Sequence, residues 1–428
     1  MDFFDSMTME IRLVQKYIRN LPLINLLVTN LLVTNLLVII MSFTLKPAKG
    51  EEFVDREELM EEMLSELEDK NSTIGYALYG KRRIGKTSIL KEIQRRLEES
   101  NECTAVYFSI WDLIDYSVEE FCEKLSMDII DAYRPKLGLE YRARELVQMP
   151  LSLLRKVLGE TEFRIIYSEF EFMISRKKNT DAGVLLEHCF GLAERLAKIT
   201  DTKCVLLIDE FPSVIDLKVD NTKIGEGILK KIRTIFEDWE RTSLCISGSI
   251  RSTMELTVLS ASSPFYRQLV VKEIKPLGVE HVRKLLRQNL EISEESVREI
   301  YSFSAGIPFY VHFIGKMLER KREINLESIR LIEKEFLEEE GNLLFREEFG
   351  SLGPKEKAII MEIALNKHTP KEIAASLEDK VSNINTFLSY LVNKGYISRE
   401  EKGFYTVDDP VFERWIREIL VGGNQQVE

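Results

Sequence analysis

Residues 76–90 of this 428-residue chain read YALYGKRRIGKTSIL. An apolar run ends at Gly80 and a helical pattern starts at Lys86, so the spacing GxxxxGKT lies between a predicted strand and a predicted helix. Gly80 and Gly85 allow a tight turn that brings backbone N–H groups close to an anion. A strand, a glycine-containing turn and a helix in this order are typical of a loop that binds nucleotide phosphates.

The residues of this loop are suited to a polyphosphate and a metal ion. The helix that starts near Lys86 points the positive end of its dipole at the anion. Lys86 supplies a mobile cation for the β and γ phosphates, and the Thr87 hydroxyl is a hard oxygen ligand for magnesium. The sequence therefore predicts that ATP and Mg²⁺ bind along the whole loop: Gly80, Lys81, Arg82, Arg83, Ile84, Gly85, Lys86, Thr87 and Ser88.

Two further apolar runs end in polar residues. The run 203–208 is typical of a strand buried on both faces of a parallel sheet, and it leads into Asp209 and Glu210. We expect Asp209 to hold magnesium and Glu210 to orient or deprotonate the attacking water. The run 243–249 predicts the next buried strand. Its tip at Ser249 could touch the γ-phosphate or the attacking water, or it could simply be the turn that ends the strand.

The alternation of strand and helix patterns predicts an α/β fold, a P-loop NTPase with a parallel sheet flanked by helices. A group of helices and a C-terminal winged helix-turn-helix domain should follow it. We expect four parts: an N-terminal extension over 1–41, the ATPase domain over 42–275, a helical domain over 276–339 and the winged helix over 340–428.

The predicted winged helix leaves its partner open. We expect its third helix to be capped by Ser382 and to end at Gly395, followed by a hairpin over 396–407. This helix carries Lys394 as its only cation. Residues 370–402 contain as many acidic as basic residues, so the electrostatic contribution to DNA binding through 370–407 is thin. A protein partner is at least as well supported. The side chains predicted to be exposed on the helix are Ser382, Asn383, Asn385, Thr386 and Ser389.

Composition narrows the setting. The net charge of −12 argues against a chain coated in nucleic acid, although a local basic patch remains compatible with it. The five cysteines are scattered and form no CxxC pair, which favours free thiols in a reducing compartment, the cytoplasm.

The first forty residues differ from the rest of the chain. Residues 20–45 carry no charge and are long enough to span a bilayer. Their interior repeats every five residues, however, so Asn25, Asn30 and Asn35 would point in three directions on a helix. No single face of the helix could then shelter all three amides, and a polar amide that faces lipid is energetically costly. We expect Met41 to be the working start, and we keep a membrane segment over 21–43 as the alternative.

The motifs together resemble a known family. FVDREEL at Phe53, GKRRIGKTSIL at Gly80 and LLIDEF at Leu206 are similar in order and spacing to the archaeal ATPase family. ISGS at Ile246, SPFYR at Ser263 and AGIPFY at Ala305 continue the resemblance, which covers essentially everything after Met41. That family belongs to the STAND branch of AAA+-like P-loop NTPases, and its members often end in a winged helix.

The resemblance implies roles for further residues. It places 53–56 near the adenine, Ser249 at the sensor-1 position and 306–308 in a lid motif that follows the nucleotide state. The family's arginine segment commonly has a glycine before its arginine, whereas Tyr266 precedes Arg267 here. This departure puts a transition-state role for Arg267 in doubt.

Rival functions can be compared by their motifs. The chain shows no NKxD after the phosphate loop and no LSGGQ-like stretch, which disfavours GTPases and transporter ATPases. The favoured function is an ATP-driven molecular switch that hydrolyses ATP. The alternatives are an origin-recognition-like DNA-binding ATPase and a switch that binds nucleotide with little turnover. Initiators of the former kind typically carry an arginine in the lid, where this chain has Ile307-Pro308.

Overall fold

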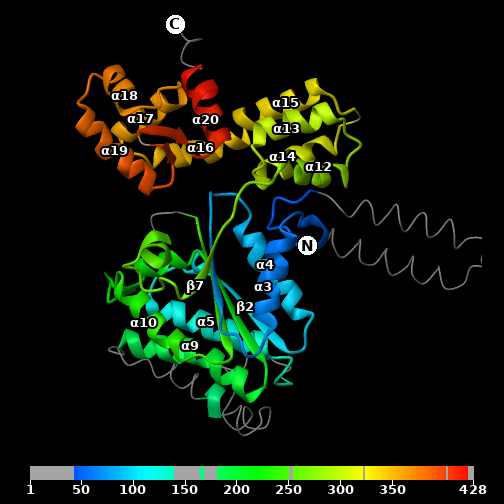
Figure 1. Ribbon diagram of the computed structural model, residues 1–428, viewed down its shortest axis with the longest axis vertical. Coiled ribbons are helices and arrows are strands. Elements are labelled where there is room, and N and C mark those ends of the chain that lie inside the picture. The colour runs from blue at the N-terminus through cyan, green and yellow to red at the C-terminus, as the bar shows by residue number, and fades with distance from the viewer. Residues whose placement is uncertain are drawn as a thin grey trace, which may run out of the picture.

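The computed structural model describes residues 43–138, 164–167, 181–249, 254–321, 323–401 and 403–422. Its centre is a five-stranded sheet with the order β2-β3-β6-β1-β7, in which every neighbouring pair is parallel (Figure 1). This sheet confirms the predicted α/β fold. The strands are β1 (Gly75–Tyr79), β2 (Cys103–Ser109), β3 (Lys203–Asp209), β6 (Thr242–Gly248) and β7 (Leu269–Glu273).

Helices cover both faces of the sheet, because alternate strand residues point to opposite sides. Leu78 and Leu207 pack with α3 and α4, whereas Ala77 and Leu206 pack with α5, α9 and α10. The apolar runs predicted as fully buried strands are therefore buried on two sides. The helices are α3 (Glu57–Glu68), α4 (Lys86–Glu98), α5 (Val118–Tyr133), α9 (Ala182–Ile199) and α10 (Gly227–Glu237).

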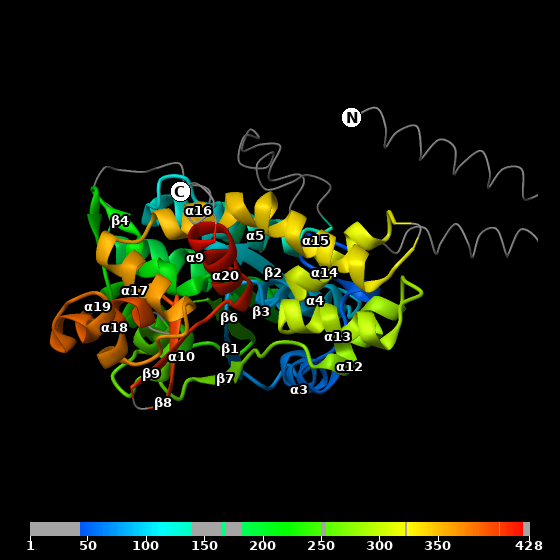
Figure 2. The same cartoon turned by 90° about the horizontal axis from the view of Figure 1, so that it is seen from above.

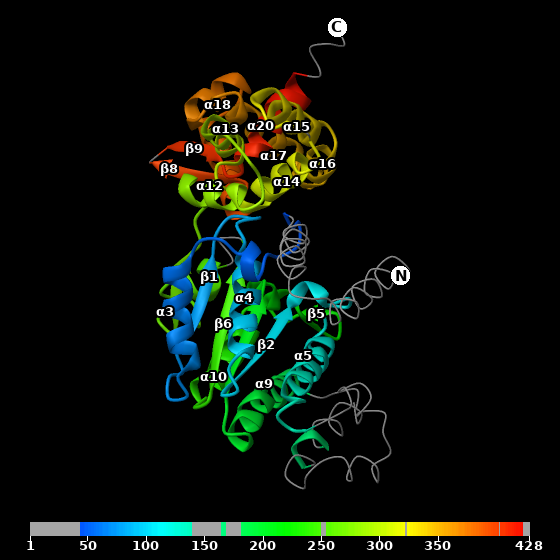
Figure 3. The same cartoon turned by 90° about the vertical axis from the view of Figure 1, so that its right-hand side faces the viewer.

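A second layer of helices lies over the carboxyl ends of the strands (Figures 1 and 3). Its first part, the lid, consists of α12 (Val279–Arg287), α13 (Glu294–Ser304), α14 (Pro308–Leu318) and α15 (Leu326–Glu338). The remainder, residues 340–422, is called the C-terminal segment below. It contains α16 (Glu340–Gly350), α17 (Pro354–Ala364), α18 (Pro370–Ser376), α19 (Val381–Asn393), the hairpin β8 (Ile397–Glu401) and β9 (Phe404–Val407), and α20 (Pro410–Trp415).

Within the C-terminal segment, α17, α18 and α19 are followed by the hairpin, in the order predicted for a winged helix. Seen from above, α12–α15 and α17–α19 lie side by side with α16 and α20 between them (Figure 2). The predicted boundary between 339 and 340 lies inside one apolar cluster. The ring centroids of Phe336 and Phe345 are 6.4 Å apart, and those of Phe345 and Trp415 are 5.8 Å apart. The division into domains stays a prediction, but lid and C-terminal segment share a core.

One predicted helix start was wrong. The third helix of the predicted winged helix begins at Val381, and its N-cap is Lys380, so Ser382 lies inside the helix and does not cap it. The Asp379 carboxylate instead accepts the Lys380 N–H at 2.6 Å and the Asn383 side-chain amide at 2.8 Å.

The chain is anchored from its first described residue. Phe43 is buried against α14, where its ring lies edge-on to His312 at 5.9 Å between ring centroids. Burial lowers the pKa of His312 to about 4, so its ring is neutral. The interpretation of residues 1–41 lies outside the described residues, as does the predicted membrane segment up to residue 42. Within the described part of the chain, no helix has the length and apolar character to cross a membrane.

Candidate functional site

The loop between β1 and α4 forms the floor of the candidate site. Gly85 has a φ of 93° and Arg83 a φ of 63°, so the loop turns through the left-handed region immediately before the helix. A side chain at Gly80 would lie 2.5 Å from the Ile274 carbonyl oxygen, which explains why glycine is needed there. The tight turn that the sequence predicted between strand and helix is present, because glycine residues and a helix start are sufficient to shape it.

Lys86 is held by its own loop. Its ammonium donates to the carbonyl oxygens of Gly80 and Lys81, each at 2.9 Å, and the residue is buried. Burial lowers the pKa of Lys86 to about 8, while the carboxylates of Glu210 and Asp209 oppose this shift. The cation is therefore enclosed at the place where the loop would receive a phosphate.

Asp209 joins the loop to the acidic strand end. Thr87 Oγ1 donates to Asp209 Oδ2 at 2.6 Å, and the Ser247 hydroxyl donates to the other carboxylate oxygen. Strand β6 lies beside β3, which brings Ser247 next to Asp209. A hydroxyl and a carboxylate are oxygen donors of the kind that magnesium prefers, so Thr87 and Asp209 fit the predicted metal site.

Sequence reasoning missed Tyr107, whose hydroxyl donates to Asp209 Oδ2 at 3.1 Å. Burial and the Asp209 charge raise the pKa of Tyr107, so the hydroxyl keeps the proton that it donates. The signal that could have found Tyr107 is the pairing of strands: β2 runs parallel to β3, and this register pairs Tyr107 with Leu207, two residues before Asp209.

Glu210 and Ser249 lie together at the next position along the sheet edge. The Ser249 hydroxyl donates to one Glu210 carboxylate oxygen, and the Ser249 N–H lies 3.3 Å from the other. Glu210 has a φ of 53°, which turns its side chain away from the strand direction. The predicted partners Lys86, Glu210 and Ser249 all line one cavity of about 640 Å³.

The walls of this cavity come from three distant parts of the chain. The segment 44–48 closes one side, and the Ala48 N–H donates to Ser88 Oγ at 3.1 Å. The lid contributes Pro308 and His312, and α16 of the C-terminal segment contributes residues that include Glu347 and Glu348. The sequence did not predict the wall from 44–48 or the wall from α16.

A smaller apolar cavity adjoins the loop beside 53–56, the segment expected near the adenine. Arg56 Nη2 donates to the Ile84 carbonyl at 2.8 Å, and burial lowers the pKa of Arg56 to about 10. This arrangement ties the segment to the loop. The lining residues are Ala48, Glu52, Phe53, Val54, Arg56, Ile84, Gly85, Ser88, Leu277, Leu285, Pro308 and His312.

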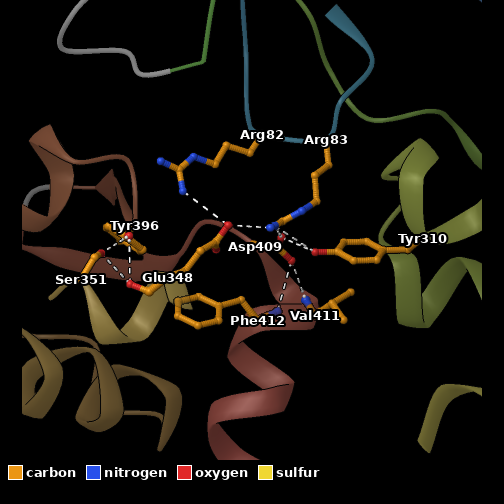
Figure 4. A network of polar contacts seen from close by, with 9 residues as sticks. All are labelled: Arg82, Arg83, Tyr310, Glu348, Ser351, Tyr396, Asp409, Val411 and Phe412. Atoms are coloured by element: carbon orange, nitrogen blue, oxygen red, sulfur yellow. Dashed lines mark hydrogen bonds and ion pairs between the residues drawn. The ribbon is translucent and has the colours of Figure 1, made fainter. Parts of the chain in front are cut away.

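The remaining cations of the loop also contact the C-terminal segment. Lys81, Arg82 and Arg83, which the sequence assigned to the nucleotide, extend toward carboxylates of the C-terminal segment (Figure 4 for the two arginines). Arg267 packs over the Tyr266 ring, 5.3 Å from its centroid, and is not among the described residues that line the 640 Å³ cavity. The doubt about a role for Arg267 therefore stays open.

Comparison with known proteins adds the relatives of this chain. The sequence model of a family described as an ATPase domain predominantly from Archaea matches residues 53–314. An uncharacterised protein of Methanocaldococcus jannaschii is 31% identical over 232 residues, 50% of this chain and 49% of that protein. The chain therefore spans about half the length of this curated relative.

Two solved structures resemble the whole arrangement. The Walker-type ATPase PABY2304 of Pyrococcus abyssi is similar with a TM-score of 0.64 and 20% identity, over 88% of this chain and 99% of that chain. The ORC2 protein of Aeropyrum pernix, in ADPNP–ADP complexes, has a TM-score of 0.52 and 11% identity, over 88% and 97%. At these identities the similarity establishes the fold.

Proposed function

Because the chain belongs to the family of ATPase domains found predominantly in Archaea, we propose that it hydrolyses ATP with magnesium and switches its C-terminal segment in response. The 2.6 Å hydrogen bond between Thr87 and Asp209 is the observation that supports this most strongly. It joins the phosphate loop to the acidic strand end at one point, where a phosphate-bound metal ion needs ligands from both.

Each polar side chain has a proposed task. Lys86 exchanges its loop carbonyls for the β and γ phosphates, and Thr87 and Asp209 hold magnesium, which when bound neutralises charge on these phosphates. Glu210 accepts a proton from a water molecule as the water oxygen attacks the γ-phosphorus. The bond from that phosphorus to the bridging oxygen breaks, and ADP and phosphate leave. Ser249 keeps the Glu210 carboxylate in the cavity.

The experiment that tests this function is ATP turnover by the chain that starts at Met41, with and without DNA. Phosphate release that requires magnesium would support hydrolysis, and stimulation by DNA would favour the origin-recognition-like alternative. Tight nucleotide binding without turnover would instead support the switch that only binds.

Tyr107 provides a test of the magnesium site. Tyr107→Phe removes one hydroxyl from Asp209 and keeps the ring. One hydrogen bond to a charged group contributes about 1.5–3 kcal/mol, so we expect the affinity for magnesium–ATP to fall on the order of ten- to a hundredfold. A titration of ATP binding at several magnesium concentrations measures this. Tyr390→Phe on the exposed face of α19 is the control. An unchanged magnesium dependence would show that Tyr107 does not position Asp209.

The switch predicts a change in hydrogen exchange. ATP should alter the protection of residues 300–422, because Ile307 and Pro308 lie between the site and a lid that shares its core with the C-terminal segment. Pro308 fixes its own φ, so this junction is a stiff bend. The comparison is empty protein against the magnesium–ATP complex of Glu210→Gln. Identical protection in both states would contradict the switch.

We propose that the partner of the C-terminal segment is a protein and not DNA. The five polar side chains predicted to be exposed on α19 are exposed. Lys394 is no free cation, since its ammonium contacts both Glu356 carboxylate oxygens at 2.7 Å. Without a free cation at this end of α19, the helix offers little attraction to a phosphate backbone.

A further inference from the structure

The tip of the phosphate loop is bound by the C-terminal segment. Arg83 forms ion pairs with Glu348 at 2.5 Å and with Asp409 at 2.9 Å (Figure 4). Its guanidinium also lies over the Phe345 ring. The Tyr310 hydroxyl of the lid also donates to Asp409. The three charged side chains are only 13–17% exposed. These contacts are more sheltered from water than an ordinary surface pair, so they hold the two layers together.

Arg82 is held much less tightly than Arg83. Its Nη1 lies 3.4 Å from the same Glu348 oxygen, and its side chain is 43% exposed. Arg82 also lines the 640 Å³ cavity together with Lys86 and Thr87. A guanidinium has five N–H donors and prefers phosphate or carboxylate partners. Arg82 is thus placed between the carboxylate of α16 and the space for a polyphosphate.

The carboxylates of α16 face this same space. Glu347 and Glu348 both line the cavity, so a triphosphate would bring further negative charge next to them. Like charges at short range repel, and they compete for the same cations. Asp408 extends the acidic surface, since its carboxylate lies 3.8 Å from the Lys81 ammonium. The carboxylates of the C-terminal segment and the phosphates of a bound nucleotide would therefore compete for the same basic side chains of the loop.

We propose that Glu348 is an internal competitor of the γ-phosphate for Arg82. With the site empty, Glu348 accepts a hydrogen bond from Arg83, pairs with Arg82 at ion-pair distance, and holds the C-terminal segment on the loop. When ATP binds, Arg82 turns to the γ-phosphate, and Glu348 is left beside a negative charge with Arg83 alone. The contact weakens, and the C-terminal segment is released. This inference rests on the proposed function and adds the residue that couples the nucleotide to the switch.

Affinity measurements on the full chain test the competition. Glu348→Gln removes the charge but keeps the shape, so binding of magnesium–ATP should tighten by about fivefold, a typical size for coupling between two sites. ADP lacks the γ-phosphate, so its affinity should change less. Glu347→Gln is the matched control: it removes a charge from the same helix and the same cavity, but no ion pair of Glu347 is present among the described residues. Its affinity for ATP should rise less than that of Glu348→Gln, because it relieves charge repulsion in the cavity without freeing an arginine.

A second measurement follows the release itself. Without nucleotide, Glu348→Gln should already exchange amide hydrogens faster around 345–352 and 408–415, the two parts that touch the loop. In the parent, ATP should produce the same change and ADP should not. If Glu348→Gln destabilises the chain, Glu348→Asp is the second variant. It keeps the negative charge but moves it away from the arginines by one methylene group, so its ATP affinity should lie between those of the parent and Glu348→Gln.

The outcomes separate the two proposals. If the parent binds and hydrolyses ATP but Glu348→Gln has the parent's affinity, the competition is refuted and the function stands. If Glu347→Gln tightens binding equally, the effect is the general charge of the cavity, and Glu348 has no special part. If the parent does not bind ATP, the proposed function and the competition both fail.

Discussion

Lys86→Ala should abolish nucleotide binding in a chain that stays folded. The ammonium of Lys86 is enclosed by the loop and is the cation that the loop presents to the β and γ phosphates. One charge-assisted hydrogen bond contributes about 1.5–3 kcal/mol, so losing contacts to two phosphates should weaken ATP binding on the order of a hundredfold or more. Isothermal titration of ATP, with circular dichroism to verify the fold, measures this.

Lys91→Ala is the matched control for that experiment. Lys91 lies on the same helix, with its ammonium over the Tyr107 ring at 4.8 Å, and it is not among the residues that line the cavity. It removes one positive charge from α4 without removing a phosphate contact, so its ATP affinity should remain close to the parent's. A folded Lys86→Ala protein with near-normal affinity would contradict the assignment of the loop.

Glu210→Gln should bind ATP and hydrolyse it far more slowly. Glutamine keeps an oxygen that can accept from the Ser249 hydroxyl, but it cannot take the proton of the attacking water. General-base catalysis is worth about 10²–10⁴-fold, so we expect turnover to fall at least tenfold, and by about that full range if Glu210 is the only base. Phosphate release in single-turnover and steady-state assays measures this, with ATP affinity determined on the same sample.

Asp209→Asn should give the opposite pattern and so serves as the comparison. It weakens the hold on magnesium, and ATP binding should then require higher magnesium concentrations. If Glu210→Gln turns over like the parent, the water is activated by another group. If both variants lose ATP binding equally, the two carboxylates do not have separate tasks.

The fold could be predicted from sequence because its signals are local. Buried parallel strands are continuous apolar runs, so β3 and β6 were recognised from their own residues. Thr369 caps α18 and Pro370 opens it, which is a local signal as well, because a cap and a first-turn proline act within one turn. Ser382 was wrong as a cap because α19 already begins at Val381, with Lys380 at the N-cap position and no side-chain capping hydrogen bond.

Those parts of the candidate site that depend on neighbouring residues in the chain could also be predicted from the sequence. Gly80, Gly85, Lys86 and Thr87 follow one another in the chain, and the turn that they form depends on their own backbone. That Asp209 lies beside Thr87 followed from a general rule, that ligands bind at the carboxyl ends of parallel strands. The hydroxyl of Tyr107 needed the register between two strands, which no single segment contains.

The sequence by itself determined that this chain has a phosphate-binding loop on a parallel sheet, with a magnesium ligand pair and a water-activating carboxylate predicted beside it. Only the tertiary structure decided where the other cations of the loop point. Arg83 pairs with Glu348 and Asp409, which are 265 and 326 residues away in the chain. The sequence of a basic residue does not specify its ion-pair partner, because any carboxylate at the same distance attracts the positive charge equally. The packing of lid and C-terminal segment into one core selects which carboxylates meet the loop, and that selection exists only in the folded chain.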